Sequence, residues 1–296
     1  MNYRDYFGST IDLNILLVTD EKQKSLVSLF SDIPSKSLEI KDVREDINLG
    51  AYDMVIVLLS FESFVVEGYN KFYSPFRKPL GFQGKYVFIR LDITRQSLME
   101  GLSTDKEILI DTLNTYKRLS KKRLRISNQA GTDISIVVND FKTCHHFIDD
   151  HSDMAFLPPS EIYAGIELGS AEGQIVVDVT IGDIYRNGQL LEGFGLVEGP
   201  VTLVVKNSRI VEITGCDRLK ECLVSLEDAA SVLVELGIGL SDLSPTGQIG
   251  IDECIKGTCH FGIGDGTFYN IDNKASIHLD LVISSPVIEE IRYEND

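Results

Sequence analysis

Short apolar runs alternate with amphipathic stretches in the first half of the chain. The runs cover residues 13–18, 54–59 and 86–91. Such nearly continuous apolar segments are expected for strands buried on both faces of a parallel sheet. Another strand is predicted at 38–43, and helices are predicted at 21–33, capped by Thr19 or Asp20, and at 103–120. The pattern predicts an open, Rossmann-like α/β layer.

The second half changes to an alternation of apolar and polar positions, which is typical of half-exposed antiparallel strands. Strands of this kind are predicted at residues 123–126, 133–138, 174–180, 200–213 and 277–284. A hairpin turn is expected at Asn207 and Ser208. One amphipathic helix is predicted over 225–239, with Ser225 as its cap and Gly237 at its C-terminal end. This half is therefore expected to be α+β and rich in antiparallel strands.

Length and charge divide the chain in the same place. Two domains are expected for 296 residues, and the change of pattern puts them at 1–122 and 123–296. Residues 1–130 carry 19 Lys and Arg against 17 Asp and Glu, a net charge of +2, whereas residues 131–296 carry 9 against 28, a net charge of −19. Such an acidic half argues against nucleic acid and against an anionic membrane surface as partners. Its carboxylates form either a solvated surface or a site for cations.

Several functional classes lack their usual sequence signals. No stretch has the roughly 20 consecutive apolar residues of a membrane span, and the polar N-terminus does not resemble a signal peptide. We therefore expect a cytoplasmic protein, in which the five cysteines are reduced thiols. No glycine-rich phosphate loop follows the early strands, which disfavours a nucleotide site there.

Four places in the second half could carry metal chemistry. His278 and Asp280 are two residues apart on a predicted strand and therefore project to one face. They form either half of a metal site or a structural hydrogen bond, and His260, between a turn and glycines, could close such a site. Glu235 is expected at a helix end, where a nearby cation would offset the unfavourable helix dipole. Glu161 follows the rigid Pro158–Pro159 pair.

The segments LPPSEIY, VELGIG, GTCHFGIGDG and IHLDLVI occur in this order, downstream of GTDISI. Together they resemble the aminopeptidase T/aminopeptidase S family of thermophilic metalloproteases, over residues 120–285. The resemblance implies a metal-dependent aminopeptidase-like hydrolase that acts on a small peptide or a related amide and forms a homodimer. It implies two divalent ions, usually Zn or Co, at a set of five ligands: Glu161, Glu235, His260, His278 and Asp280. Two imidazoles and three carboxylates also fit Mn or Fe. Glu161 and Glu235 would also take part in catalysis.

One position departs from that family. Its peptidases carry a tyrosine seven residues after the GTxH histidine, where this chain has Thr267, and Tyr269 is expected to substitute as the catalytic tyrosine. A ring-cleaving 2,5-dihydroxypyridine dioxygenase resembles another branch of the same fold, with one Fe(II) held by two His and one Asp. His260, His278 and Asp280 would match that set, so an Fe(II) dioxygenase acting on a small aromatic or heterocyclic substrate is the alternative. A third possibility is a non-peptidase relative that binds metal.

Three further histidines are clustered in the segment TCHHFIDDHSD. These are His145, His146 and His151. They could line the same cavity, but a polar surface loop is the simpler interpretation of so hydrophilic a segment.

Overall fold

Residue contacts divide the chain into two units. The computed structural model describes residues 3–72, 77–143, 146–149, 152–159, 161–186 and 189–291. The first unit comprises Met1–Lys106 and Cys144–Ser160, and the second comprises Glu107–Thr143 and Glu161–Asp296. These units are defined by residue contacts. Whether the chain has two independent domains with a boundary at residue 122 stays a prediction.

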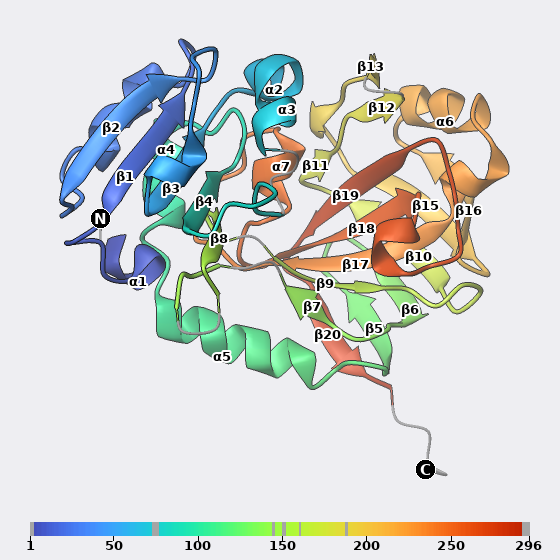
Figure 1. The fold of residues 1–296 in the computed structure, drawn as a ribbon. Helices are drawn as coiled ribbons and strands as arrows, with labels where there is room; N and C mark the ends of the chain where they lie inside the picture. Colours follow the sequence, from blue (N-terminus) through green and yellow to red (C-terminus); the bar gives the residue numbers. More distant parts are fainter. Residues whose placement is uncertain are drawn as a thin grey trace. The chain divides into compact units, whose positions relative to one another are not determined.

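The first unit contains a five-stranded sheet in which every neighbouring pair is parallel, in the order β2-β1-β3-β4-β8 (Figure 1). Its strands are β1 (Asn14–Thr19), β2 (Ser37–Asp42), β3 (Met54–Leu58), β4 (Lys85–Ile89) and β8 (Met154–Leu157). All five residues of β3 are buried, which is why its sequence is continuously apolar. The four predicted strands are confirmed, whereas β8 joins the sheet from a distant part of the chain. The finer assignment as Rossmann-like stays a prediction.

Short helices precede the first of these strands and lie between the others along the chain. They are α1 (Tyr3–Phe7), η1 (Lys24–Phe30), η2 (Leu49–Ala51), α2 (Phe61–Ser63), η3 (Phe64–Gly68), α3 (Tyr69–Phe72) and α4 (Arg95–Gly101). The predicted helix at 21–33 is shorter than expected and is a 3-10 helix. The Ser28 and Ser31 hydroxyls donate to backbone carbonyls three residues earlier, which competes with the α-helical pattern. Leu26 and Phe30 are buried.

The second unit is built mainly from two antiparallel sheets. One has the order β16-β15-β10-β6-β5-β20, and the other has the order β14-β11-β19-β18-β17-β9-β7 (Figure 1). The strands of the first are β5 (Arg123–Ser127), β6 (Asp133–Val137), β10 (Glu172–Val177), β15 (Val201–Lys206), β16 (Arg209–Thr214) and β20 (Val287–Glu290). The strands of the second are β7 (Lys142–Thr143), β9 (Glu161–Gly165), β11 (Thr180–Ile181), β14 (Gly195–Leu196), β17 (Leu233–Gly239), β18 (Thr258–Gly264) and β19 (His278–Ser284).

Smaller elements complete this part of the chain. They are α5 (Lys106–Lys117), α6 (Asp217–Val224), η4 (Asp228–Ser231), α7 (Ile249–Asp252), η5 (Thr267–Tyr269) and the strand pair β12 (Ile184–Arg186) and β13 (Gln189–Glu192). The predicted hairpin is confirmed between β15 and β16, where Asn207 and Ser208 have φ angles of 49° and 61°. The fold is thus mixed, with one parallel sheet and many antiparallel strands. None of the described helices has the length and hydropathy that a bilayer crossing requires.

The predicted helix at 225–239 is wrong. Asp228–Ser231 forms one 3-10 turn, and Leu233–Gly239 is the strand β17 in the interior of its sheet, between β9 and β18. All seven residues of β17 are buried. A strand buried on both faces has no polar face, so its apolar run cannot be distinguished by periodicity from a buried helix. Glu235 therefore lies within a strand, and the helix-dipole argument does not apply to it.

Candidate metal centre

The seven-stranded sheet places the five predicted ligands on one face. Residues opposite one another on antiparallel strands project to the same side. Glu235 on β17 is opposite Gly262 on β18, and Gly262 is opposite Asp280 on β19. His260 is opposite Gly237 in the next row. The other two ligands lie on the same face. His278 is two residues from Asp280 on β19, and Glu161 is opposite Gly239, which is two residues from Gly237 on β17.

Two glycines make room for these side chains. A Cβ atom on Gly237 would lie 2.1 Å from Cε1 and 2.2 Å from Nε2 of His260. A Cβ atom on Gly262 would lie 2.7 Å from Oε2 of Glu235 and 2.8 Å from Cε1 of His278. All four distances are far below van der Waals contact, so the imidazole rings occupy space that only glycine leaves free. Sequence reasoning missed this role, although the alternation of Gly with ligand residues in VELGIG and HFGIG was a visible signal.

The structure brings all five side chains together in two groups that share Glu235. In the first group, Nε2 of His260 lies 3.0 Å from Oε2 of Glu161 and 3.8 Å from Oε1 of Glu235. In the second, Nε2 of His278 lies 3.1 Å from Oε2 of Glu235 and 3.1 Å from Oδ1 of Asp280. One candidate ligand atom from each member lies within 4.8 Å of the others in its group. Their role as metal ligands stays a prediction.

Neighbouring groups orient the second imidazole. Nδ1 of His278 lies 2.9 Å from the carbonyl oxygen of Asp265 and donates to it in the neutral tautomer. Nε2 is then left to face Glu235 and Asp280. Metal-binding histidines usually have such an acceptor on the other ring nitrogen. Asp265 was not singled out from the sequence, because its contribution is a backbone carbonyl that any residue could provide.

The chemistry of this donor set fits a divalent cation. Glu235 and His260 are each 1% exposed, yet three carboxylates meet here and no described lysine or arginine forms an ion pair with them. Among the described atoms, Oε2 of Glu161 and Nδ1 of His260 are buried without a hydrogen-bond partner. Oε2 of Glu161 lies 3.0 Å from Nε2 of His260 as an ion-pair contact and not as a hydrogen bond. Two imidazoles with three carboxylates suit Zn, Mn or Fe.

Without a cation, protonation of the two imidazoles can offset two of the three carboxylate charges of the cluster. Burial alone would raise the pKa of Glu235, but the two imidazoles outweigh it and hold the pKa at about 2. Burial alone would lower the pKa of His260, but the charge of Glu161 and contacts with Glu235 raise it well above 6.5. Asp280 and Glu235 likewise raise the pKa of His278 against the effect of burial. The metal-free site is therefore a set of ion pairs that are buried at Glu235 and His260 and half-buried at the other three residues.

We expect zinc to bind more weakly as the pH falls. The pKa values of His260 and His278 are raised well above 6.5, so both imidazoles hold a proton more strongly in the metal-free protein than a free imidazole does. Each must release its proton before Nε2 can bind a metal. Displacing two protons should weaken the apparent affinity by up to ~100-fold for each pH unit below those pKa values. Zinc titrations against a competing chelator between about pH 6 and pH 8 measure this dependence, and a constant affinity would contradict it.

Tyr269, not Thr267, supplies a hydroxyl to the cluster. The Tyr269 hydroxyl lies 3.4 Å from Nε2 of His278, and the two rings are 5.4 Å apart. Thr267 instead donates to Oδ2 of Asp265 at 2.9 Å and is exposed. Burial, and then the charges of the nearby carboxylates, raise the pKa of Tyr269, so its hydroxyl keeps its proton. The catalytic role expected for Tyr269 stays a prediction.

The remaining histidines contribute no described ligand to this cluster. His145 and His151 lie outside the described residues. His146 is buried, and its ring lies edge-on to Phe147 with the centroids 6.2 Å apart. It belongs to the first unit, whereas all five predicted ligands belong to the second.

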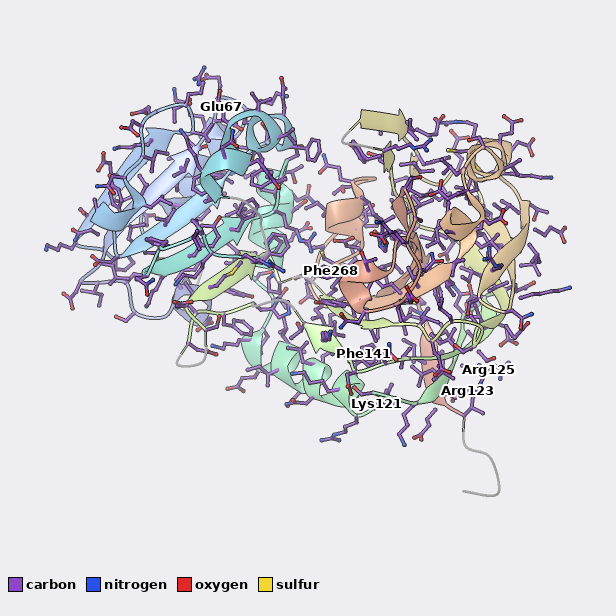
Figure 2. All side chains as sticks on the ribbon, turned by 45° about the vertical axis from the view of Figure 1, so that its right-hand side comes forward. Glu67, Lys121, Arg123, Arg125, Phe141 and Phe268 are labelled. Carbon is purple, nitrogen blue, oxygen red and sulfur yellow. The ribbon has the colours of Figure 1, made fainter. Side chains whose placement is uncertain are left out.

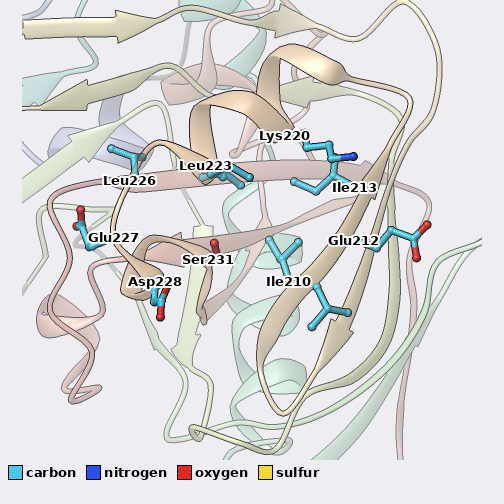
Figure 3. A pocket seen from close by; sticks show the side chains of 11 residues that line it. Ile210, Glu212, Ile213, Lys220, Leu223, Leu226, Glu227, Asp228 and Ser231 are labelled. Atoms are coloured by element: carbon cyan, nitrogen blue, oxygen red, sulfur yellow. The ribbon is translucent and has the colours of Figure 1, made fainter.

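Two hollows in the second unit differ in their relation to the cluster. The one in Figure 3, of about 310 Å³, lies between β16 and α6 and is lined by apolar residues such as Ile210 and Leu223. None of the five predicted ligands lines it. A smaller hollow of about 200 Å³ includes Tyr163 and Tyr269 in its wall. Tyr269 therefore lines this hollow and also contacts the candidate metal centre.

Two solved structures resemble this fold. "Structure of 2,5-dihydroxypridine Dioxygenase from Pseudomonas putida KT2440" matches with a TM-score of 0.59 and 14% identity, covering 95% of this chain and 89% of that one. "Wild-type AmpT from Thermus thermophilus" matches with a TM-score of 0.57 and 10% identity, covering 97% and 92%. At these identities the likeness concerns the fold alone. The comparison with curated proteins finds no match.

A family model separates the two resemblances. The family described as "NicX: 2,5-dihydroxypyridine 5,6-dioxygenase" matches residues 27–289. The aminopeptidase interpretation, in contrast, has only the distant likeness in fold. The comparisons thus favour the alternative over the main prediction. Because the match spans most of the chain and every residue of the candidate metal centre, the protein belongs to the NicX family.

Proposed function

We propose that this protein is a metal-dependent, ring-cleaving dioxygenase acting on a small aromatic or heterocyclic diol. The observation that carries the proposal is the NicX family match, which covers residues 27–289 and therefore the whole candidate centre. The convergence of two imidazoles and three carboxylates supports it, because a bound cation would compensate the negative charge that these carboxylates bring together.

The proposed roles follow from position. His260, His278 and Asp280 would hold Fe(II), since two imidazoles and one carboxylate are the ligand set of many non-haem iron oxygenases. When bound, Fe(II) would supply the redox chemistry that a reaction with O₂ requires. The Asp265 carbonyl would keep the His278 ring in its binding orientation. Glu161 would accept a proton from a ring hydroxyl, because its Oε2 is buried without a hydrogen-bond partner among the described atoms.

A second candidate function rests on Glu235. This carboxylate belongs to both ligand groups, with Oε1 toward His260 and Oε2 toward His278. A shared carboxylate between two ligand groups suits a pair of divalent ions, which in hydrolases polarise a carbonyl and activate a water molecule. An aminopeptidase-like hydrolase is therefore the alternative.

Metal stoichiometry and oxygen consumption distinguish the two functions. The full chain, purified without chelator, is analysed for its metals and then assayed with 2,5-dihydroxypyridine in an oxygen electrode and with aminoacyl arylamides. One iron per chain with diol-dependent oxygen uptake supports the dioxygenase. Two ions per chain with arylamide hydrolysis would overturn it in favour of the hydrolase, and a protein that binds neither iron nor zinc would overturn both.

We expect Tyr269→Phe to lower kcat by ~10-fold or more while KM and metal content change little. The hydroxyl is 3.4 Å from Nε2 of His278 and keeps its proton, so it can donate to a charge that develops in the transition state, an effect within the range of general acid catalysis. The ring would remain, with its contacts to Tyr163 and Phe268. Steady-state kinetics on whichever substrate is turned over measure the effect. Tyr185→Phe, at an exposed tyrosine of β12, is the control, and equal kcat values in both variants would exclude this role.

A further inference from the structure

A lysine lies in the same cross-strand row as one of the candidate ligands. Lys142 on β7 is opposite Tyr163 on β9, Tyr163 is opposite Gly237 on β17, and Gly237 is opposite His260 on β18. These side chains share one face of the sheet. At ~4.8 Å between neighbouring strands, the backbone positions of Lys142 and His260 are about 14 Å apart across the sheet. A lysine side chain covers part of that distance, and the remainder is about the length of one substituted aromatic ring.

Lys142 has no charge partner in the part of the chain that the structure describes. It is exposed and lines the hollow of about 200 Å³. The other charges of this hollow cancel, because Nζ of Lys121 pairs with Oδ2 of Asp140 at 2.9 Å. The hollow therefore has a net positive charge, although residues 131–296 carry only 9 Lys and Arg against 28 Asp and Glu. Asn139 and Asn270 add amide groups to its wall.

Aromatic rings connect this hollow to the cluster. The Tyr163 ring lies 5.6 Å from that of Tyr269 and 5.9 Å from that of Phe268. Phe268, labelled with Lys121 in Figure 2, is 57% exposed and therefore presents apolar surface to solvent. Tyr269 extends to His278. A planar ligand could thus lie against these aromatic rings, between Lys142 and the candidate metal ligands.

We propose that Lys142 binds a carboxylate on the substrate, so that the substrate is a ring diol bearing a carboxylate group. This inference rests on the proposed function for the position of the reacting ring. The carboxylate would lie in the hollow beside Lys142, with the amides of Asn139 and Asn270 as further donors. The ring would lie along Tyr163 and Phe268, with its hydroxyls at the cluster. Lys142 is a specificity-determining residue in this arrangement.

Matched ligands with and without a carboxylate test the assignment. Binding to the metal-loaded full chain is measured by calorimetry under argon, so that no turnover is required. The first pair is 2,5-dihydroxybenzoate and hydroquinone, and the second is Phe-Gly and its amide. We expect 2,5-dihydroxybenzoate to bind about 5- to 10-fold more tightly than hydroquinone, the size of a partly exposed charged hydrogen bond. Lys142→Gln should abolish this preference and leave hydroquinone binding unchanged, while Lys142→Arg should retain most of it.

The matched control is Lys122→Gln, at an exposed lysine that pairs with Glu290 and does not line the hollow. It should bind all four ligands as the unaltered protein does. Equal affinities of the unaltered protein for 2,5-dihydroxybenzoate and hydroquinone would overturn the inference. So would a preference that Lys122→Gln abolishes just as Lys142→Gln does. A Lys142-dependent preference confined to the dipeptide pair would overturn the ring assignment. Oxygen uptake, measured separately, decides the proposed function whatever these titrations give.

Discussion

Glu235→Gln is expected to abolish stable metal binding and, with it, activity. Glu235 is the one residue that both ligand groups share, and the substitution keeps its shape while removing its charge. Loss of a supporting group beside a metal site already costs ~10–100-fold in affinity, so loss of the shared ligand should cost at least the upper end of that range. Elemental analysis and metal titration of the variant measure the loss.

The same substitution should also destabilise the metal-free protein. The pKa of Glu235, held at about 2, shows that the folded state stabilises its ionised form, a contribution present above the usual value of 4.5 and lost only as the pH falls toward 2. Without that charge, the buried imidazole of His260 and the half-buried imidazole of His278 lose a shared partner, and breaking a buried ion pair typically costs ~3–5 kcal/mol. Thermal unfolding with and without zinc shows both effects. Glu212→Gln, at an exposed position of β16, is the control. A zinc-dependent rise in Tm that Glu235→Gln leaves intact would exclude Glu235 as a ligand.

Gly237→Ala is expected to disrupt the candidate metal centre without replacing any of its five predicted ligands. The added Cβ would lie 2.1 Å from Cε1 of His260 and 2.7 Å from Oε2 of Glu161. His260 is fully buried and has no solvent into which its ring could move, so the ring or the strand must shift. Overfilling of a close-packed interior typically costs ~1–3 kcal/mol. A displaced imidazole should also lower the metal affinity by ~10-fold or more, as the loss of a supporting contact does.

The control separates lost space from the intrinsic effect of the substitution. Gly199 has open space around its Cβ position and no strained backbone angle, so Gly199→Ala should leave both stability and metal binding unchanged. For both variants, chemical denaturation measures the stability and zinc titration measures the metal affinity. If Gly237→Ala bound zinc as tightly as Gly199→Ala, the His260 ring would not be fixed against Gly237 in the way described.

The local sequence pattern was sufficient to predict an element where the burial of that segment left a recognisable periodicity or composition. β1, β3 and β4 were predictable because strands inside a parallel sheet are apolar on both faces. The pairing of His278 with Asp280 was predictable because side chains two apart on a strand project together. β17 was not, because complete burial removed the polar face that would have distinguished a strand from a helix.

The sequence by itself determined which donor side chains are present, that two of them share a strand face, and through the combined motifs that five belong together. Only the tertiary structure decided that Glu235 lies between two ligand groups, that Gly237 and Gly262 leave room for the imidazoles, and that Lys142 shares a row with His260. The physical reason is that periodicity reports the environment of one segment at a time. Distances between side chains on different strands depend on strand order and register, which arise only when the sheet assembles.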